Sequence, residues 1–493
     1  MPLSAVELEV LGEAAGDLFE DYEELARLDP PKLVGTARER HVVDAGGRPD
    51  DGDNPYYGWA WRCRIEGGPT GPLAGRTVGV KDSIAVAGVP LRNGSDFFEG
   101  FVPADDATVV TRLLDAGAVI AGKTAVPSFC FEGAGIYGEP TPLPENPAGP
   151  DHFPGGSSSG SAALVAAGEV DLALGGDQGG SIRIPASWCG CVGHKPTHGL
   201  VPYTGALTMD PTFDHLGPLA GNVADCATMM DVLAGPDGLD PRQEREQPGS
   251  FTEGLDRGVD GLRIGLLQEG FGIAGVSHPD VDAAVRKAAL SLTAQGARVE
   301  EVSVPLHRQG AAIWDAICLQ GATDLMRASG LACWVGGYQW VEAAEFIGAH
   351  LKERAATFPP PLKLTLILGQ LMTRREGRIQ YARAQNLALW LGREYDRMLA
   401  DFDVLVMPTT PMKAPRRPGA EMSERDRIIL AVGIDSSRNV APFDVSGHPS
   451  LSVPCGRSDG LPIGLSVVGK KFDDATVLRV GRSVEVSVSE VHR

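Results

Sequence analysis

Short apolar runs alternate with alanine-rich stretches of helical periodicity from about residue 70 onward. The strand-like runs occur in GRTVGVKD, AVIAGKT, VDLAL, LRIGLL and FDVLVMPT, and between them lie helix-like stretches such as ATVVTRLLDAG, SAALVAAG and VDAAVRKAALSLTAQG. This alternation is typical of α/β proteins, in which helices pack on a sheet whose strands are mostly buried. The sequence therefore predicts an α/β fold around a large, mainly buried sheet.

Two regions depart from the alternation. Residues 5–28 have apolar positions at helical spacing with acidic residues between them, and Pro30 and Pro31 end that pattern. Residues 310–400 look almost entirely helical and hold four of the seven tryptophans, at positions 314, 334, 340 and 390. We therefore expect an N-terminal helical segment over 1–65 and an α/β domain over 66–493. The helical insertion at about 310–400 supplies a wall for an apolar substrate pocket.

The chain of 493 residues carries 64 acidic and 44 basic residues, a formal net charge of −20. A field of this sign repels nucleic acid and anionic membranes, so we expect neither as a partner. No stretch reaches the roughly 18 uncharged apolar residues of a membrane span. The N-terminus MPLSAVELEV lacks the basic and apolar regions of a signal peptide. We expect a cytoplasmic protein.

Eight cysteines are scattered along the chain, as is usual for reduced intracellular thiols. Cys189 and Cys191 in WCGC could ligate a metal, but no second pair or close histidine completes a set of four ligands. We expect no metal and no cofactor.

Two short motifs match nucleotide-binding and hydrolase patterns by their letters alone. GAVIAGKT at 117–124 fits the phosphate-binding loop, but that loop must follow a strand and open a helix, and here the order is reversed. GSSSG at 156–160 fits the nucleophile elbow of α/β-hydrolases, but loop-like residues precede it. A serine–histidine–aspartate triad stays open as a minority alternative, with four candidate histidines: His194, His198, His215 and His448.

The glycines of GGDQGGSIRIP at 175–185 surround a single hydroxyl, that of Ser181. A serine that attacks a carbonyl needs N–H donors for the developing oxyanion, and glycines leave such donors unobstructed. Gln178, Gly179, Gly180 and Ser181 itself could supply them. An ordinary tight turn would explain a lone GGS tripeptide equally well, but a second cluster, GGSSSGS at 155–161, favours a catalytic site.

Lys81 in TVGVKDSIAV is the best candidate for the base that Ser181 needs. It interrupts an apolar run, and a buried lysine that loses its charge can act as a base in serine–lysine hydrolases. The alternative is a lysine at the end of a strand, paired with Asp82. On the local sequence alone the two interpretations are equally supported.

These stretches together resemble the amidase signature hydrolases. GRTVGVKDSIAVAGVPLRNGS, GAVIAGKTAVP, PGGSSSGSAALVAAG, GGDQGGSIRIPASWCG and FDVLVMPTTP follow the order of that family, from about residue 55 to the C-terminus. The resemblance implies a large mixed sheet covered by helices on both sides. It also implies a Ser–cis-Ser–Lys triad of Ser181 as the acylated nucleophile, Ser157 after a cis peptide bond, and Lys81 as the base.

Within the family, the chain looks like the bacterial amidases that accompany nitrile hydratases. That likeness implies hydrolysis of aliphatic or aromatic carboxamides and a homodimer. Asp177 and Arg183 would support the glycine loop, and Cys130, Phe131 and Gly133 would line the substrate pocket. The alternatives are an aryl acylamidase or carbamate hydrolase of the same fold and, less favoured, an amidotransferase component that depends on a partner.

Overall fold

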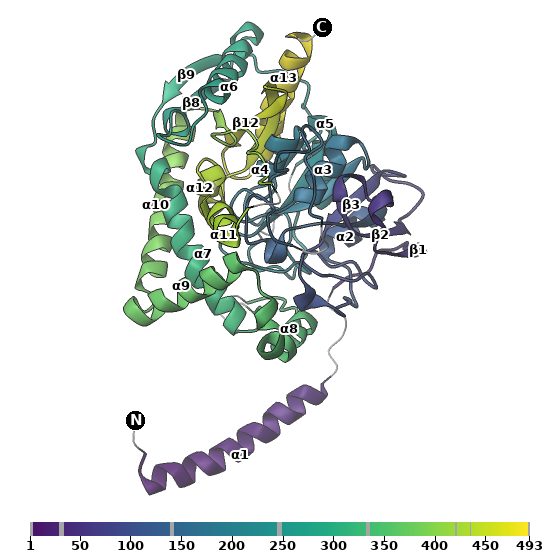
Figure 1. Cartoon of the computed structure of the whole chain (residues 1–493), viewed down its shortest axis with the longest axis vertical. Helices are drawn as coiled ribbons and strands as arrows, with labels where there is room; N and C mark the ends of the chain where they lie inside the picture. Colours follow the sequence, from purple (N-terminus) through teal and green to yellow (C-terminus); the bar gives the residue numbers. More distant parts are fainter. Residues whose placement is uncertain are drawn as a thin grey trace.

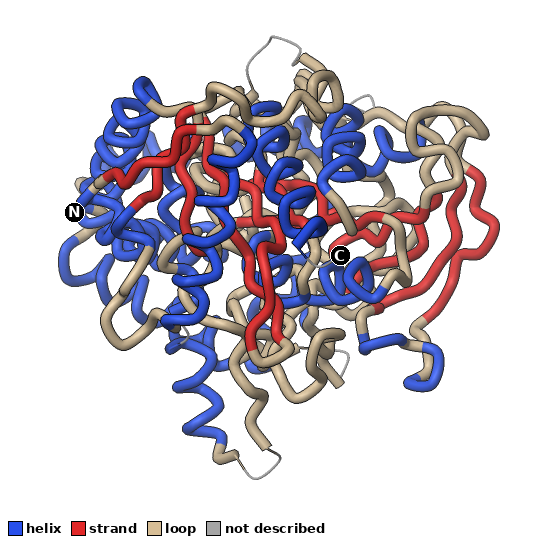
Figure 2. Tube along the Cα trace, turned by 90° about the horizontal axis from the view of Figure 1, so that it is seen from above, coloured by secondary structure: helices blue, strands red, loops and turns tan. Residues whose placement is uncertain are grey.

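The computed structural model describes residues 3–28, 34–138, 142–243, 249–331, 336–419, 422–433 and 435–491. Within these residues one sheet of twelve strands has the order β1-β2-β4-β3-β5-β7-β6-β11-β12-β10-β8-β9 (Figures 1 and 2). Four neighbouring pairs, β3–β4, β3–β5, β8–β10 and β8–β9, run parallel, and the other pairs run antiparallel. The α/β fold with a large mixed sheet is therefore confirmed.

The strands are β1 His41–Gly47, β2 Trp59–Glu66, β3 Thr77–Lys81, β4 Val119–Thr124, β5 Leu172–Asp177, β6 Val192–Lys195, β7 His215–Ala220, β8 Arg263–Leu267, β9 Arg298–Val302, β10 Val404–Pro408, β11 Ser450–Ser458 and β12 Leu461–Gly469. The α-helices are α1 Ala5–Arg27, α2 Thr108–Asp115, α3 Ser159–Ala167, α4 Arg183–Cys189, α5 Val223–Leu233, α6 Pro279–Ser291, α7 Gly310–Arg327, α8 Val341–Arg354, α9 Pro360–Glu376, α10 Ile379–Asp401, α11 Glu424–Gly433, α12 Ala441–Ser446 and α13 Asp474–Val491.

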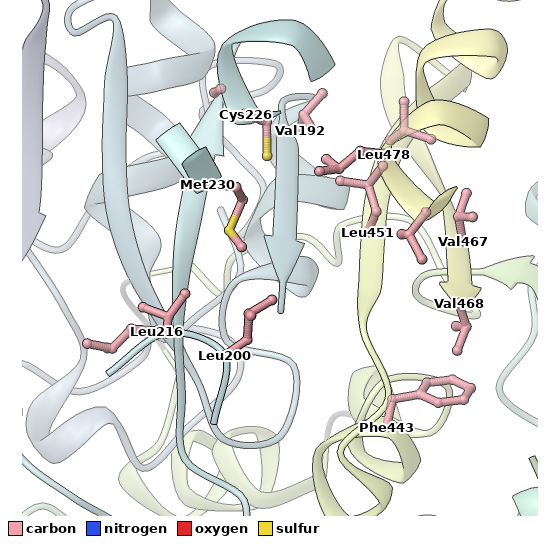
Figure 3. Close-up of a cluster of buried hydrophobic side chains, with 14 of the residues drawn as sticks. Val192, Leu200, Leu216, Cys226, Met230, Phe443, Leu451, Val467, Val468 and Leu478 are labelled. Atoms are coloured by element: carbon pink, nitrogen blue, oxygen red, sulfur yellow. The ribbon is translucent and has the colours of Figure 1, made fainter. Parts of the chain in front are cut away.

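The middle of the sheet is buried on both faces. Every residue of β5, β7 and β12 is buried, and because successive side chains of a strand point to opposite faces, helices and loops must cover both. Figure 3 shows part of this core, where Met230 of α5 and Leu478 of α13 lie among side chains of β6, β11 and β12. A rigid, fully covered sheet of this kind holds the loops at its strand ends in fixed positions.

The N-terminal helix forms where the sequence predicts it, over Ala5–Arg27. Ser4 and Glu7 form a capping box: Glu7 N–H donates to Ser4 Oγ at 3.2 Å, and Ser4 N–H donates to Glu7 Oε2 at 2.7 Å. Figure 1 shows α1 apart from the sheet and its covering helices. The expected helical segment over 1–65 is too long, however, because β1 (His41–Gly47) and β2 (Trp59–Glu66) form one edge of the sheet.

Residues 310–401 form α7, α8, α9 and α10 in the part that the structure describes, with one 3₁₀ turn between α8 and α9. Trp334 and Cys333 lie outside the described residues. No helix in the described ranges has both the length and the apolar character to cross a membrane.

Candidate active site

Lys81, the last residue of β3, faces Ser157 in the buried interior. Lys81 Nζ and Ser157 Oγ lie 2.8 Å apart, and Nζ also donates to the carbonyl oxygen of Gly176 at 2.9 Å. Both side chains are almost fully buried, and burial lowers the pKa of Lys81. The Gly156–Ser157 peptide bond is cis, as the resemblance implied. Two uncharged oxygens thus accept hydrogen bonds from the buried Lys81 Nζ.

The alternative interpretation, in which Lys81 pairs with Asp82, is wrong. Asp82 pairs instead with Lys123 of β4, whose Nζ lies 2.9 Å from Asp82 Oδ1 in a fully buried ion pair. Lys81 and Asp82 therefore have different partners, Ser157 and Lys123. Lys123 belongs to GAVIAGKT, and because those residues form a strand rather than a loop opening a helix, they do not make a phosphate-binding loop.

Ser181 lies in the loop that joins β5 to α4. Ser158 N–H donates to the carbonyl oxygen of Ser181 at 3.1 Å, so the backbone holds the two serine clusters side by side. Ser181, Gln178 and Gly179 line a cavity of about 330 Å³. Ser181 thus lines the cavity, and its carbonyl oxygen is bonded to the residue that follows Ser157, whose hydroxyl contacts buried Lys81.

Asp177 organises the loop around Ser181. Its carboxylate accepts hydrogen bonds from Gly180 N–H at 2.5 Å and Ile182 N–H at 3.1 Å, and from Arg183 Nε at 2.9 Å. Burial alone would raise the pKa of Asp177, but the Arg183 guanidinium outweighs it and holds that pKa well below its usual range. Arg183 also pairs with buried Asp444 at 2.7 Å, which ties the loop to α12.

The expectation that four N–H groups face the oxyanion is wrong for one of them, that of Gly180. The N–H of Gly180 points to Asp177 and not to the cavity, since it already donates to Oδ1. Among the hydrogen bonds of the described residues, none engages the N–H groups of Gln178, Gly179 or Ser181. These three remain as candidate donors.

Two aromatic residues that the sequence did not assign to the loop hold Gln178. Trp314 Nε1 donates to the carbonyl oxygen of Gln178, and Gln178 Nε2 donates to Tyr203 Oη at 3.0 Å. A Cβ on Gly179 would lie 2.7 Å from the Trp314 ring, so the indole fits only against glycine. Sequence reasoning named Trp314 as a pocket wall but gave no signal that it would bond the loop itself.

The expected pocket residues Cys130, Phe131 and Gly133 line the same cavity as Ser181. Trp314 joins them, whereas Trp390 is 49% exposed on α10, so only part of the tryptophan wall forms. Glu132 also lines the cavity and escaped sequence reasoning; burial raises its pKa to about 8.

The four candidate histidines have partners elsewhere, and none lines the Ser181 cavity. His194 bonds Asp474, His198 the carbonyl oxygen of Pro211, His215 the carbonyl oxygen of Phe213, and His448 bonds Asp396. The thiols of Cys189 and Cys191 contact backbone carbonyl oxygens at 3.3 and 3.9 Å. Within the described ranges, no cluster of three or more histidine, cysteine or acidic side chains could hold a metal ion.

Comparison with known proteins agrees with this geometry. Residues 60–478 match the model of the family described as Amidase. The chain belongs to the amidase signature family. An enantioselective amidase of Rhodococcus rhodochrous is 43% identical over 438 residues, covering 88% of this chain and 83% of that protein. One component of the glutamyl-tRNA(Gln) amidotransferase of Methanosarcina mazei is 38% identical over 422 residues, covering 85% of each.

A solved bacterial aryl acylamidase of the amidase signature family has the same fold. The two structures superpose with a TM-score of 0.71 at 28% identity, covering 85% of this chain and 84% of that chain. The amidase signature resemblance and its fold are therefore confirmed, and the chain is a member of a family of amide hydrolases. The relatives include both amidases and amidotransferase components. Membership of the family therefore does not define the acyl and amine groups of the substrate.

Proposed function

We propose that the chain hydrolyses carboxamides to the carboxylic acid and ammonia or an amine, through an acyl-enzyme on Ser181. The observation that carries this proposal is the buried 2.8 Å contact between Lys81 Nζ and Ser157 Oγ, directly behind the loop that presents Ser181 to the cavity. A lysine with a lowered pKa can accept a proton, and a serine between lysine and nucleophile can relay it.

In acylation, neutral Lys81 takes the hydroxyl proton of Ser157 while Ser157 takes that of Ser181. Ser181 Oγ attacks the amide carbonyl carbon, and the carbonyl π electrons move to the oxygen. The relay then returns the proton to the amine nitrogen as the C–N bond breaks. The amine leaves neutral and the acyl group stays on Ser181.

Water, deprotonated through the same relay, attacks the acyl-enzyme and releases the acid. In both steps the negative oxygen needs donors, and the N–H groups of Gln178, Gly179 and Ser181 supply them from the cavity wall. Asp177 and Arg183 act as positioning residues, because they bond the loop and not the reacting atoms. No metal or cofactor enters either step.

Aromatic and apolar surface in the cavity favours aryl or branched substrates. Phe131, Trp314 and Ile184 line it together with Met209. An aryl acylamidase is thus the second candidate, because its substrates carry an aromatic group, and a carbamate hydrolase of the same fold stays beside it. The likeness to the amidotransferase component keeps a third role, glutamine hydrolysis for a partner, as the least favoured. We also expect the enzyme to be a cytoplasmic homodimer.

The decisive experiment assays the purified chain alone on benzamide, an aliphatic amide, an anilide, a carbamate and glutamine. Intact-mass and peptide spectrometry of the quenched reaction should find the acyl group on the Ser181 peptide, and Ser181→Ala should lack it. Hydrolysis of none of these amides by the chain alone, or an acyl group on another residue, would contradict the proposal.

A further inference from the structure

The wall of the Ser181 cavity carries more acidic than basic side chains. Its acidic and basic members are Glu132, Asp315, Asp435 and Arg438. Burial raises the pKa of Glu132 to about 8, so that carboxyl is mostly protonated at neutral pH. Asp435 is paired with Arg438, whose Nη2 and Nε lie 3.1 and 3.2 Å from Asp435 Oδ1. The remaining carboxylate of the wall is that of Asp315.

Asp315 lies on the face of α7 that lines this cavity. The members of that face recur at helical spacing and are Ala311, Ala312, Trp314, Asp315, Cys318 and Leu319. The other charged residues of α7 have partners of their own. Asp324 pairs with Arg378, and Arg327 Nη1 donates to Gln370 Oε1 at 2.8 Å. By contrast, none of the hydrogen bonds and ion pairs among the described residues includes the Asp315 carboxylate.

Asp315 also follows directly on Trp314, the residue that bonds the Ser181 loop. Trp314 Nε1 donates to the carbonyl oxygen of Gln178, and its ring lies against Gly179. A substrate whose carbonyl carbon lies at Ser181 Oγ therefore shares the cavity with the Asp315 side chain. The cavity walls desolvate the Asp315 carboxylate enough to raise its pKa, and a cation beside it would oppose that effect.

We propose that the preferred amides carry a protonated amine away from the scissile bond, and that the Asp315 carboxylate pairs with that amine. This inference rests on the proposed hydrolysis at Ser181 and names its substrate class. Phe131, Met209 and Trp314 give the cavity apolar surface for the carbon skeleton, so the class is an aromatic or branched amide with an ammonium substituent. An ion pair in a partly desolvated cavity is stronger than one in water. The formal net charge of −20 adds a field that attracts cationic substrates.

The test compares three benzamides that differ in the charge of one substituent at about pH 7.5: para-aminomethylbenzamide is a cation, para-ethylbenzamide is neutral and para-carboxymethylbenzamide is an anion. Wild type should hydrolyse the cation with a kcat/KM about tenfold or more above that of the neutral amide, and the anion least well. Asp315→Asn should lower the ratio of kcat/KM for the cation over the neutral amide by about tenfold, chiefly through a higher KM for the cation. Asp315→Lys should reverse the order, so that the anion is hydrolysed faster than the cation.

Asp256→Asn is the matched control, because it removes the same charge from a side chain that is 79% exposed and pairs with Arg482. It should keep the wild-type ratio, and melting temperatures should show that every variant is folded.

Several results would overturn the assignment of Asp315 while leaving the hydrolysis proposal intact. They are equal rates on the cation and the neutral amide in wild type, an unchanged ratio in Asp315→Asn, and a ratio that falls in Asp435→Asn but not in Asp315→Asn. Hydrolysis of none of the three benzamides would instead contradict the hydrolysis proposal. Calorimetric Kd values for the same compounds, measured on wild type and Asp315→Asn, would then decide whether Asp315 binds the amine.

Discussion

Lys81 Nζ and Ser157 Oγ lie 2.8 Å apart although 76 residues separate them in the chain. Neither is exposed, and Asp82, the acidic residue next to Lys81 in the sequence, pairs with Lys123 instead. A buried amine whose hydrogen-bond partners are neutral oxygens favours the uncharged state. The position of Lys81 therefore suits a base that accepts a proton from Ser157 better than a cation that neutralises a carboxylate.

Lys81→Arg should lower kcat/KM for amide hydrolysis by about 10³-fold or more. A guanidinium does not deprotonate in proteins and therefore cannot be the base. In wild type, kcat/KM should rise with pH as Lys81 loses its proton, and burial, which lowers the pKa of Lys81, should bring that rise below the usual range of lysine. Steady-state rates on an amide and its phenyl ester from about pH 6 to 10 check both. Near-normal amide hydrolysis by Lys81→Arg would show that Lys81 is only structural.

Ser181→Ala should lose hydrolysis by about 10⁴-fold or more with an unchanged melting temperature, because it removes only the nucleophile. Ser157→Ala should be nearly as damaging, since it interrupts the proton path between Ser181 and Lys81. Burst kinetics on an activated ester provide the measurement, because neither variant should accumulate acyl-enzyme. A Ser157→Ala enzyme with a wild-type rate and pH profile would remove Ser157 from the mechanism.

Gly180→Ala should destabilise the protein and the site together. Gly180 has φ +118°, and a Cβ there would lie 2.3 Å from Val440 Cγ2. We expect a loss of about 2–4 kcal/mol in the free energy of unfolding, measured by urea denaturation. Gly168→Ala is the matched control: it has φ +76° but no atom within 4 Å, so it should cost only the backbone strain of about 1–2 kcal/mol. Equal losses in the two variants would contradict a packing role for Gly180.

Trp314→Phe should lower kcat about tenfold while leaving an aromatic ring in place. Phenylalanine keeps the apolar contact but lacks the N–H that donates to the Gln178 carbonyl oxygen, so the loop loses a hydrogen bond and not its packing. Trp390→Phe is the control, because its Nε1 donates to Glu394 on the exposed face of α10. An unchanged kcat in Trp314→Phe would show that Asp177 suffices to hold the loop.

Glu132→Gln should stabilise the protein at alkaline pH. Burial raises the pKa of Glu132 to about 8, so the folded state keeps a proton that the unfolded chain releases near pH 4.5. Wild-type stability should therefore fall as pH rises from about 4.5 to about 8, and the glutamine variant should escape that part of the fall. Melting temperatures at about pH 5 and pH 9 should diverge by several degrees, whereas Glu253→Gln, exposed on the surface, should follow wild type. Parallel curves would contradict the assignment.

The sequence predicts the parts of the site that depend on local chain geometry. The glycine loop after a buried strand was recognisable because only glycine leaves backbone donors open beside Ser181. The bond from Gly180 N–H to Asp177 was also within reach, since aspartate often binds an N–H two or three residues later. The sequence does not predict which carboxylate or hydroxyl Lys81 contacts. Ser157, its partner, and Lys123, the partner of Asp82, lie on segments distant in the sequence.

Residues 41–66 show that sequence-based prediction of the fold is also limited where contacts between distant segments decide the structure. The sequence pattern places them before the α/β domain, yet β1 and β2 form an edge of its sheet. An edge strand has a neighbour on one side only, and β1 is exposed at six of its seven residues. Its sequence, HVVDAGG, therefore lacks the sustained apolar run that identifies the central strands.

The order of the strands has a consequence for synthesis on the ribosome. β11 and β12, made last among the strands, lie between β6 and β10, so they join a half built from β1–β7 to a half built from β8–β10. Until about residue 469 has emerged, both halves present bare strand edges to the crowded cell, and such edges pair readily with other chains. A nonsense mutation or ribosome stall between β10 and β11 would thus release not a shortened enzyme but a chain with two unmatched sheet halves, which we expect to be cleared or to aggregate.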